Sequence, residues 1–175
     1  MKLKWTENRA LACIVLAVAV LAGIVGIGGA KARSLAAEPA AWYADNMSAD
    51  FAARESAAGS LIALARDAGV DESIVEQANA ALDASCEAAD SPSARYAAGL
   101  KLKTAVELLY NALPAPERDN MGGPAQMAWS EFSSRTSILS HSVPEYNALV
   151  RAAQEKLSGF PASLLAGGAD LEEMA

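Results

Sequence analysis

The sequence predicts an all-α protein in which an N-terminal transmembrane helix is followed by an elongated antiparallel helical bundle. Alanine contributes 41 of the 175 residues and aromatic residues only 6%. This composition favours helices, because alanine is the strongest helix former and a poor strand residue. An uncharged apolar stretch lies near the N-terminus, and no segment shows the period-two alternation of a half-buried strand. A chain of this length suits one domain with an accessory segment.

Residues 1–10 are a short basic N-terminus, and residues 11–30 are the predicted transmembrane helix. The stretch 11–30 holds no charged residue, and as a helix it would be about 30 Å long, the thickness of the hydrocarbon core. A cleaved signal peptide is the alternative, since Ala30-Lys31-Ala32 resembles a cleavage motif. The apolar core is longer than in most signal peptides and Lys31 interrupts the motif, so a retained anchor is predicted.

The basic residues that flank this stretch predict its orientation. Lys2, Lys4 and Arg9 precede it, whereas only Lys31 and Arg33 follow it closely. Because cytoplasmic flanks carry the larger number of basic residues, the N-terminus is expected in the cytoplasm. The prediction is therefore a single-pass protein of the cell membrane whose bundle is extracytoplasmic.

Helix-breaking residues divide the rest of the chain into a linker, a bundle and a tail. Pro39 disfavours helix in the residue before it, so residues 31–39 are predicted to be a juxtamembrane linker. The helical bundle is expected to cover residues 40–160, and residues 161–175 to be an acidic flexible tail. Helices are expected within the bundle at about 40–68, 71–87, 92–113 and 124–159. The segment 114–124 between the last two is rich in turn residues and is predicted to be a loop.

Capping residues and prolines support these boundaries. Asp71 is the expected N-cap of the second helix, and Ser91 followed by Pro92 is a start signal for the third. In the fourth helix, Pro144 is expected to kink or restart the helix, with Ser142 available as the cap.

Residues at heptad spacing mark the faces that are expected to point into the core. Arg54 is the one charge in the stripe of the first helix. Its side chain either reaches water along its aliphatic stem or pairs with a carboxylate of a facing helix, for which Glu131 is the first candidate. The other expected core positions include Met47, Phe51, Ala58, Leu61, Ala65, Ile74, Ala78, Leu82, Ser85, Tyr96, Leu100, Val106, Leu109, Phe132, Leu139, Tyr146, Val150, Ala153 and Leu157.

Some of the residues in these helices, together with residues near the end of the chain, form a pattern that is typical of a known protein family. It consists of Arg54 and Leu61 in the first helix, Glu131, Phe132 and Ile138 in the fourth, and Tyr146, Asn147, Val150, Leu157, Phe160 and Pro161 towards the end of the chain. The pattern resembles the LemA family, whose C-terminal signature contains Tyr-Asn twice and then Phe-Pro. Ala153-Gln154 stands here in place of the second Tyr-Asn. The resemblance implies a membrane-anchored helical bundle of unknown molecular activity, in which these signature residues are structural.

The sequence predicts no catalytic, cofactor-binding or metal-binding residue, and the protein is not expected to be an enzyme. His141 is the only histidine, so no two-histidine metal site can form. Phosphate-binding loops, dinucleotide fingerprints and nucleophile elbows are absent from the sequence. Asn147 is instead expected to cap a neighbouring helix or to hydrogen-bond a backbone group.

The predicted function is that of a membrane-anchored, non-enzymatic scaffold or adaptor of the bacterial cell envelope. A processed, secreted helical protein that binds a ligand or acts on the envelope is the alternative. The expected partners are the lipid bilayer and another envelope or membrane protein. Ala19 with Gly23, and Ala22 with Gly26, have the spacing of small residues that pack membrane helices. This spacing either serves a homo-oligomer through the membrane helix or reflects only that Gly and Ala are common in such helices. The net charge of −7 disfavours binding to nucleic acid.

Overall fold

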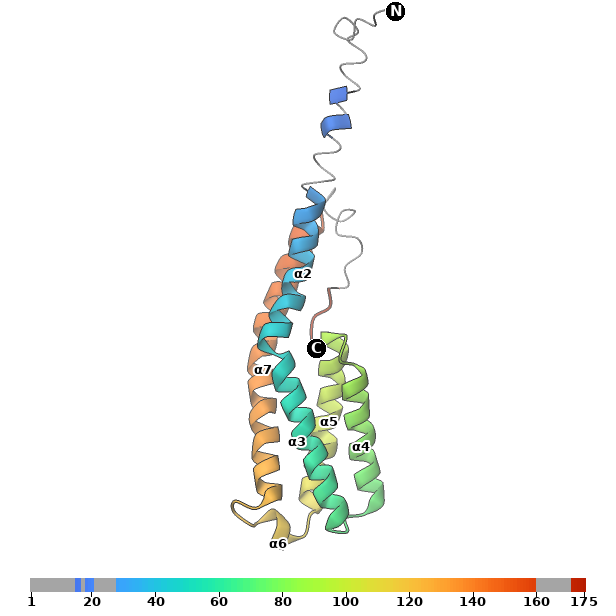
Figure 1. Ribbon diagram of the computed structural model, residues 1–175, viewed down its shortest axis with the longest axis vertical. Helices are drawn as coiled ribbons and strands as arrows, with labels where there is room; N and C mark the ends of the chain where they lie inside the picture. Colours follow the sequence, from blue (N-terminus) through green and yellow to red (C-terminus); the bar gives the residue numbers. More distant parts are fainter. Residues whose placement is uncertain (1–14, 17, 21–27, 160–170) are drawn as a thin grey trace, which may run out of the picture. The chain divides into compact units, whose positions relative to one another are not determined.

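The computed structural model describes residues 15–16, 18–20, 28–159 and 171–175 (Figure 1). The chain is divided into two compact units, Met1–Glu38 with Ala152–Leu171, and Pro39–Arg151 with Glu172–Ala175. All regular secondary structure in the described residues is helical, which confirms the all-α prediction. The helices are α2 (Gly29–Asn46), α3 (Ser48–Asp67), α4 (Glu72–Glu87), α5 (Pro92–Ala112), α6 (Ala115–Arg118) and α7 (Pro124–Leu157).

The larger unit is a helical bundle. Helices α3, α4 and α5 follow one another through tight turns and lie side by side, and each packs against the other two (Figure 1). Small residues on the facing sides let the helix backbones approach closely. The core of these three helices contains Ala57, Ala58, Leu61, Ile62, Ala65, Val75, Ala78, Leu102, Ala105, Val106, Leu109, Tyr110 and Leu113.

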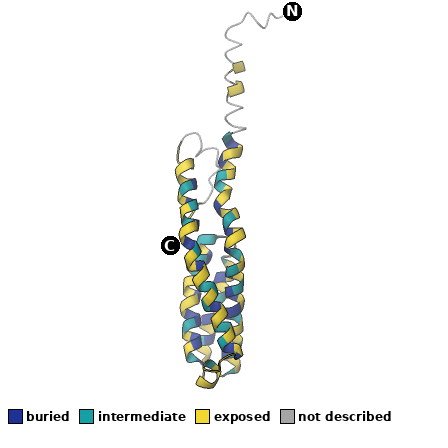
Figure 2. Ribbon diagram, turned by 90° about the vertical axis from the view of Figure 1, so that its left-hand side faces the viewer, coloured by how far each residue is buried: buried dark blue, intermediate teal, exposed yellow. Residues whose placement is uncertain are grey.

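Helix α7 joins this core through large aromatic side chains. Phe132 is only 1% exposed and belongs to the same core cluster. The ring of Trp129 stacks on Tyr110 of α5 with the centroids 4.4 Å apart. Figure 2 shows the buried positions of the bundle alternating with exposed ones along each helix, as expected for amphipathic helices.

The predicted starts of α4 and α5 are confirmed. The Asp71 carboxylate accepts a hydrogen bond of 2.8 Å from the backbone nitrogen of Ser73, and so caps α4. Ser91 is the N-cap of α5, with Pro92 in the first turn. Both caps satisfy backbone N–H groups that have no partner within the helix.

The predicted linker at residues 31–39 and the single helix at residues 40–68 are wrong. Helix α2 runs through Pro39, and the chain changes direction at Met47 instead, between α2 and α3. The Pro39 ring is among the fully buried side chains, so packing offsets the hydrogen bond that a proline removes from a helix. At Met47 the φ angle of −126° departs from the helical value, although the i→i−4 hydrogen bonds from Met47 and from Phe51 are kept.

The fourth predicted helix is continuous, so the expected restart of the helix at Pro144 is wrong. Helix α7 contains Pro144 in its interior. Pro144 is exposed, so water can reach the carbonyl group that loses its helical partner. Ser142 is not a cap, because its hydroxyl donates to the backbone oxygen of Ile138 at 3.1 Å. The predicted loop at 114–124 contains the short helix α6.

The inward face of α5 differs from the predicted one in its first half. Leu100 is 44% exposed and Tyr96 is half-buried, whereas Arg95 and Gly99 are buried. The helix is rotated so that Arg95 points into the bundle, where it meets a carboxylate. In the second half of α5, Val106 and Leu109 are buried as predicted.

Most of the predicted transmembrane segment, residues 11–30, lies outside the described residues. Among the helices that are described, none is both long enough and apolar enough to cross a bilayer. Of the predicted tail, residues 161–170 also lie outside the described part of the chain.

Candidate binding site

The predicted signature residues are mostly interior. Tyr146, Leu61, Phe132, Val150 and Leu157 are all buried. Ile138 is an exception, since 40% of its surface is exposed. Phe160 and Pro161 lie outside the described residues. The buried members of the set therefore hold the helices together, as expected from their heptad spacing.

A polar cluster is buried between α3, α4 and α5. Glu55 of α3 accepts hydrogen bonds from Arg95 of α5, with Nη2–Oε2 and Nε–Oε1 distances of 2.6 and 3.1 Å. The hydroxyl of Ser85 in α4 donates to the same carboxylate at 2.6 Å. Arg95 also donates from Nη1 to the Tyr43 hydroxyl of α2 at 3.2 Å. Burial lowers the pKa of Arg95, but the hydrogen bonds to Glu55 and Tyr43 outweigh it and raise the pKa above the usual range.

Arg54 lies beside this cluster, and none of the described residues accepts a hydrogen bond from its Nε or Nη2 atom, so the predicted pair with Glu131 is wrong. Arg54 is 2% exposed, and its Nε and Nη2 atoms are buried with no acceptor. Its guanidinium lies 5.0 Å from the ring centroid of Phe51, on which Arg95 also packs at 5.1 Å. Burial, together with the nearby charge of Arg95, lowers the pKa of Arg54.

Glu131 pairs within its own helix instead. Its Oε1 atom accepts from Arg135 Nε at 2.7 Å, and Arg135 Nη1 also donates to Asp50 of α3 at 2.7 Å. Arg135 lies four positions after Glu131, so the two side chains are neighbours on one face of α7. The cross-helix ion pair of α7 with α3 is therefore made by Arg135 and Asp50.

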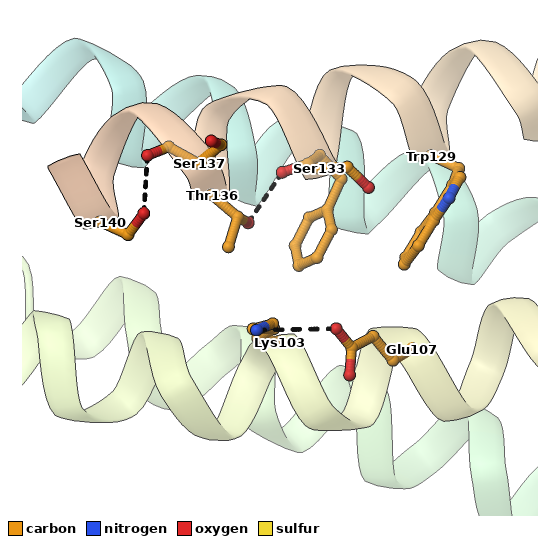
Figure 3. A pocket seen from close by; sticks show the side chains of 8 residues that line it. Lys103, Glu107, Trp129, Ser133, Thr136, Ser137 and Ser140 are labelled. Atoms are coloured by element: carbon orange, nitrogen blue, oxygen red, sulfur yellow. Dashed lines mark hydrogen bonds and ion pairs between the residues drawn. The ribbon is translucent and has the colours of Figure 1, made fainter.

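An open groove of about 250 Å³ lies between α5 and α7 (Figure 3). Lys103 and Glu107 line it from α5 and form an ion pair of 3.9 Å, with both side chains close to half exposed. The α7 side contributes Trp129, Phe132, Ser133, Thr136, Ser137 and Ser140.

The hydroxyl groups of this groove are partly used by the helix itself. Thr136 donates to the backbone oxygen of Phe132 at 2.8 Å, and Ser140 to that of Ser137 at 2.7 Å. His141, on the same helix, is exposed, and its Nδ1 atom lies 2.7 Å from the backbone oxygen of Ser137. In the described part of the chain, no three His, Cys, Asp or Glu residues are grouped as metal ligands.

A second surface, around Asn147 of α7, holds an extended piece of the chain. The Asn147 side chain donates from Nδ2 to the backbone oxygen of Met174 and accepts at Oδ1 from the backbone nitrogen of Met174, both at 2.8 Å. The amide group of one side chain thus satisfies both main-chain groups of one residue. The expectation that Asn147 hydrogen-bonds a backbone group is confirmed.

The segment Glu172–Ala175 makes further contacts with this surface, so the prediction of a flexible tail is wrong for these residues. The hydroxyl of Ser93 in α5 donates to Glu172 at 2.6 Å, and Arg151 of α7 pairs with Glu173 at 2.9 Å. Met174 is 3% exposed. Glu172 and Glu173, whose charges predicted a solvated tail, are the residues that bind to Ser93 and Arg151. In the smaller unit, Gln154 donates to the backbone oxygen of Leu171 at 2.7 Å.

Tyr146, next to Asn147, anchors this surface in an aromatic cluster. Its ring centroid lies 6.4 Å from that of Trp42 and 6.3 Å from that of Tyr43, both in α2. Burial raises the pKa of Tyr146, and the nearby Tyr43 and the carboxylate of Glu172 raise it further. Packing of Tyr146 fixes the orientation of α7 and hence the position of the Asn147 amide.

The sequence predicted a core position for Tyr146 and a backbone hydrogen bond for Asn147, but not that the C-terminal segment is the partner of Asn147. Comparisons with protein-family models, with curated proteins and with solved structures find no match to this chain.

Proposed function

We propose that the protein is a membrane-anchored, non-enzymatic helical adaptor of the bacterial cell envelope, similar to the LemA family. Residues 11–30 anchor it in the cell membrane as a single span, with the basic N-terminus in the cytoplasm. The helical bundle lies on the extracytoplasmic side and binds another envelope protein. No step of this function requires a cofactor.

The contact between Asn147 and Met174 carries this proposal. A side-chain amide that pairs with both main-chain groups of an extended residue is a way to hold a peptide segment whatever its side chain. Charged and hydroxyl groups on either side, Arg151 and Ser93, add contacts to the neighbouring acidic side chains. The bundle thus offers a surface suited to an extended polypeptide, which is what an adaptor requires.

The anchor and its orientation are supported by the sequence around residues 11–30. Twenty consecutive residues without a charge are long enough for one span of the bilayer. Three basic side chains precede the stretch and two follow it closely, which favours a cytoplasmic N-terminus.

Cys86 provides a direct test of the orientation. It is a free and exposed cysteine at the end of α4, whereas Cys13 lies in the apolar stretch. In the full chain with Cys13→Ala, a membrane-impermeant maleimide added to intact cells or spheroplasts should label Cys86. Burial, and next the charge of Glu55, raise the pKa of the Cys86 thiol, so the labelling is done at mildly alkaline pH, where more thiolate is present.

The control for this labelling is the double variant Cys13→Ala, Cys86→Ser, which should remain unlabelled. Labelling of Cys86 only after the cells are lysed would show that the orientation is inverted.

The alternative is a processed, secreted helical protein that binds a ligand or acts on the envelope. Intact mass of the mature protein, together with its distribution between membrane and soluble fractions, separates the two. An adaptor with a retained anchor keeps residues 11–30 and stays in the membrane fraction. A mass that corresponds to cleavage near Ala32, with the protein in the soluble fraction, would favour the alternative.

Binding of a partner is tested by crosslinking in the membrane. A photoreactive amino acid at Arg151, an exposed position beside the Asn147 surface, should give one defined adduct whose mass identifies the partner. The matched control is the same amino acid at Asn79, which is exposed on α4. Equal adducts from both positions, or none from Arg151, would contradict the adaptor.

A further inference from the structure

We propose that the surface around Asn147 recognises an extended acidic peptide segment of the partner, and that the chain's own Glu172–Ala175 segment occupies this surface until the partner displaces it. This inference rests on the proposed function, because it names the chemistry of the adaptor's partner. The occupant to which it commits is a segment with two acidic residues followed by a large unbranched apolar residue.

The main-chain contacts define the conformation of the ligand. Residues 171–175 form neither helix nor strand. Asn147 takes both main-chain groups of Met174. These contacts are open to any residue except proline at that position, because proline lacks the N–H group. The N–H and C=O groups of one residue point to the same side in strand-like backbone, so the paired bonds to Asn147 favour a ligand that is extended at this residue.

The side-chain contacts define its sequence. Glu172 and Glu173 meet donors from two different helices, Ser93 of α5 and Arg151 of α7. Met174, between Glu173 and Ala175, is almost completely buried at 3% exposure. Burial of a methionine side chain contributes more binding free energy than an exposed ion pair does. The apolar residue thus supplies most of the affinity, and the acidic residues supply selectivity.

The contact between the Glu172–Ala175 segment and the bundle is weak enough to be reversible. Arg151 is 60% and Glu173 36% exposed, so water and salt weaken their ion pair. The contact is favoured because the segment belongs to the same chain, which raises its effective concentration to the order of 1 mM. A partner segment of the same chemistry can compete when the membrane holds it near the bundle.

Peptide binding to the full chain in detergent micelles tests the proposal. The probe is a fluorescein-labelled Leu-Glu-Glu-Met-Ala peptide, and its binding is followed by fluorescence anisotropy. A variant that lacks residues 171–175 should bind the probe about tenfold more tightly than the unaltered chain, because its site is empty. The full-length variant Met174→Asp should also bind more tightly than the unaltered chain, because its own segment is weakened without being removed.

Substitutions of Asn147 and Asn79 test whether the loss of probe binding is specific to the Asn147 surface. In the variant that lacks 171–175, Asn147→Leu should weaken probe binding by about tenfold, since two hydrogen bonds are lost. Asn79→Leu, on the exposed face of α4, should leave binding unchanged. A probe with Asp in place of its Met should not bind. Helix content by circular dichroism must match between variants, so that loss of binding is not loss of fold.

The outcomes of these experiments distinguish a failure of the proposed peptide site from a failure of the proposed adaptor function. If the variant without 171–175 keeps its helix content but does not bind the probe, or if Asn147→Leu has no effect, the peptide site is refuted. An adduct from Arg151 in the membrane would then still support an adaptor with a different partner. If the unaltered chain forms dimers that disappear when 171–175 is removed, the occupant is a second copy, and the proposal of a separate partner is overturned.

Discussion

Arg95 of α5 and Glu55 of α3 form a buried ion pair, with Arg95 Nη2 2.6 Å from Glu55 Oε2 and both side chains about nine-tenths buried. Ser85 and Tyr43 complete the hydrogen bonds of the pair. The cluster therefore ties together four segments of the larger unit, and its geometry sets the rotation of α5.

We expect Arg95→Met to lower the free energy of unfolding by about 3–5 kcal/mol, because it leaves the Glu55 carboxylate buried without its cation. Urea unfolding of the full chain in micelles, followed by circular dichroism, measures the change. The matched control is Arg135→Met, which breaks the partly exposed pairs with Glu131 and Asp50; each pair should contribute about 0–1 kcal/mol. Equal costs for the two variants would contradict a structural role for the buried pair.

Arg54→Met should raise the free energy of unfolding, in contrast to Arg95→Met, which should lower it. The Nε and Nη2 atoms of Arg54 are buried without an acceptor, and an unsatisfied buried group costs about 1–3 kcal/mol. Methionine fills a similar volume without that cost, so the free energy of unfolding should rise by about this amount. The same urea titration decides the question, and a loss as large as that of Arg95→Met would show that Arg54 has a partner in solution.

Gly99→Ala should destabilise the bundle through Arg54. A Cβ atom added at Gly99 would overlap the Nη2 atom of Arg54, so the guanidinium must move within a packed interior. Overpacking of this kind costs about 1–3 kcal/mol. In the background of Arg54→Ala the same glycine substitution should cost nothing, because the obstacle is gone. If Gly99→Ala costs the same in both backgrounds, the two residues are not in contact.

Phe132 and Ile138, on the same helix, should respond differently to truncation. Phe132→Ala removes a ring that is 1% exposed and should cost about 3–5 kcal/mol. Ile138 is 40% exposed, so Ile138→Ala should change the stability by no more than about 0.5 kcal/mol. Thermal and urea unfolding of both variants measure this difference. Similar losses would mean that Ile138 is covered in the folded protein.

Local signals in the sequence were enough to predict the helical class, two helix starts and the buried face of α3. Alanine content predicted helices, and the caps at Asp71 and Ser91 placed the starts of α4 and α5, because a cap acts through hydrogen bonds within a few residues. The stripe of Met47, Phe51, Arg54, Ala58 and Leu61 also identified the buried face of α3, including its unusual arginine. These features depend only on helical periodicity, which the sequence contains directly.

Prolines were less informative, because their effect depends on surroundings. Pro39 was expected to interrupt a helix and Pro144 to kink or restart one, yet both lie inside continuous helices. At Pro39 burial of the ring offsets the lost hydrogen bond, and at Pro144 exposure to water provides a substitute. Neither burial nor exposure can be deduced from the proline itself.

By itself, the sequence determined the helical class, the capped starts of α4 and α5 and the buried position of Tyr146. Only the tertiary structure decided which charges meet. Glu55 follows Arg54 directly in the chain, and a rotation of α3 decides which of the two finds a partner. Glu55 and Arg95 are 40 positions apart in the chain. They can pair only because α3 and α5 pack with these two residues at the same level along the bundle axis. The acidic residues of Glu172–Ala175 likewise predicted a solvated tail, whereas Ser93, Arg151 and Asn147 bind this segment. These three residues come from two helices, and only the tertiary structure brings them together.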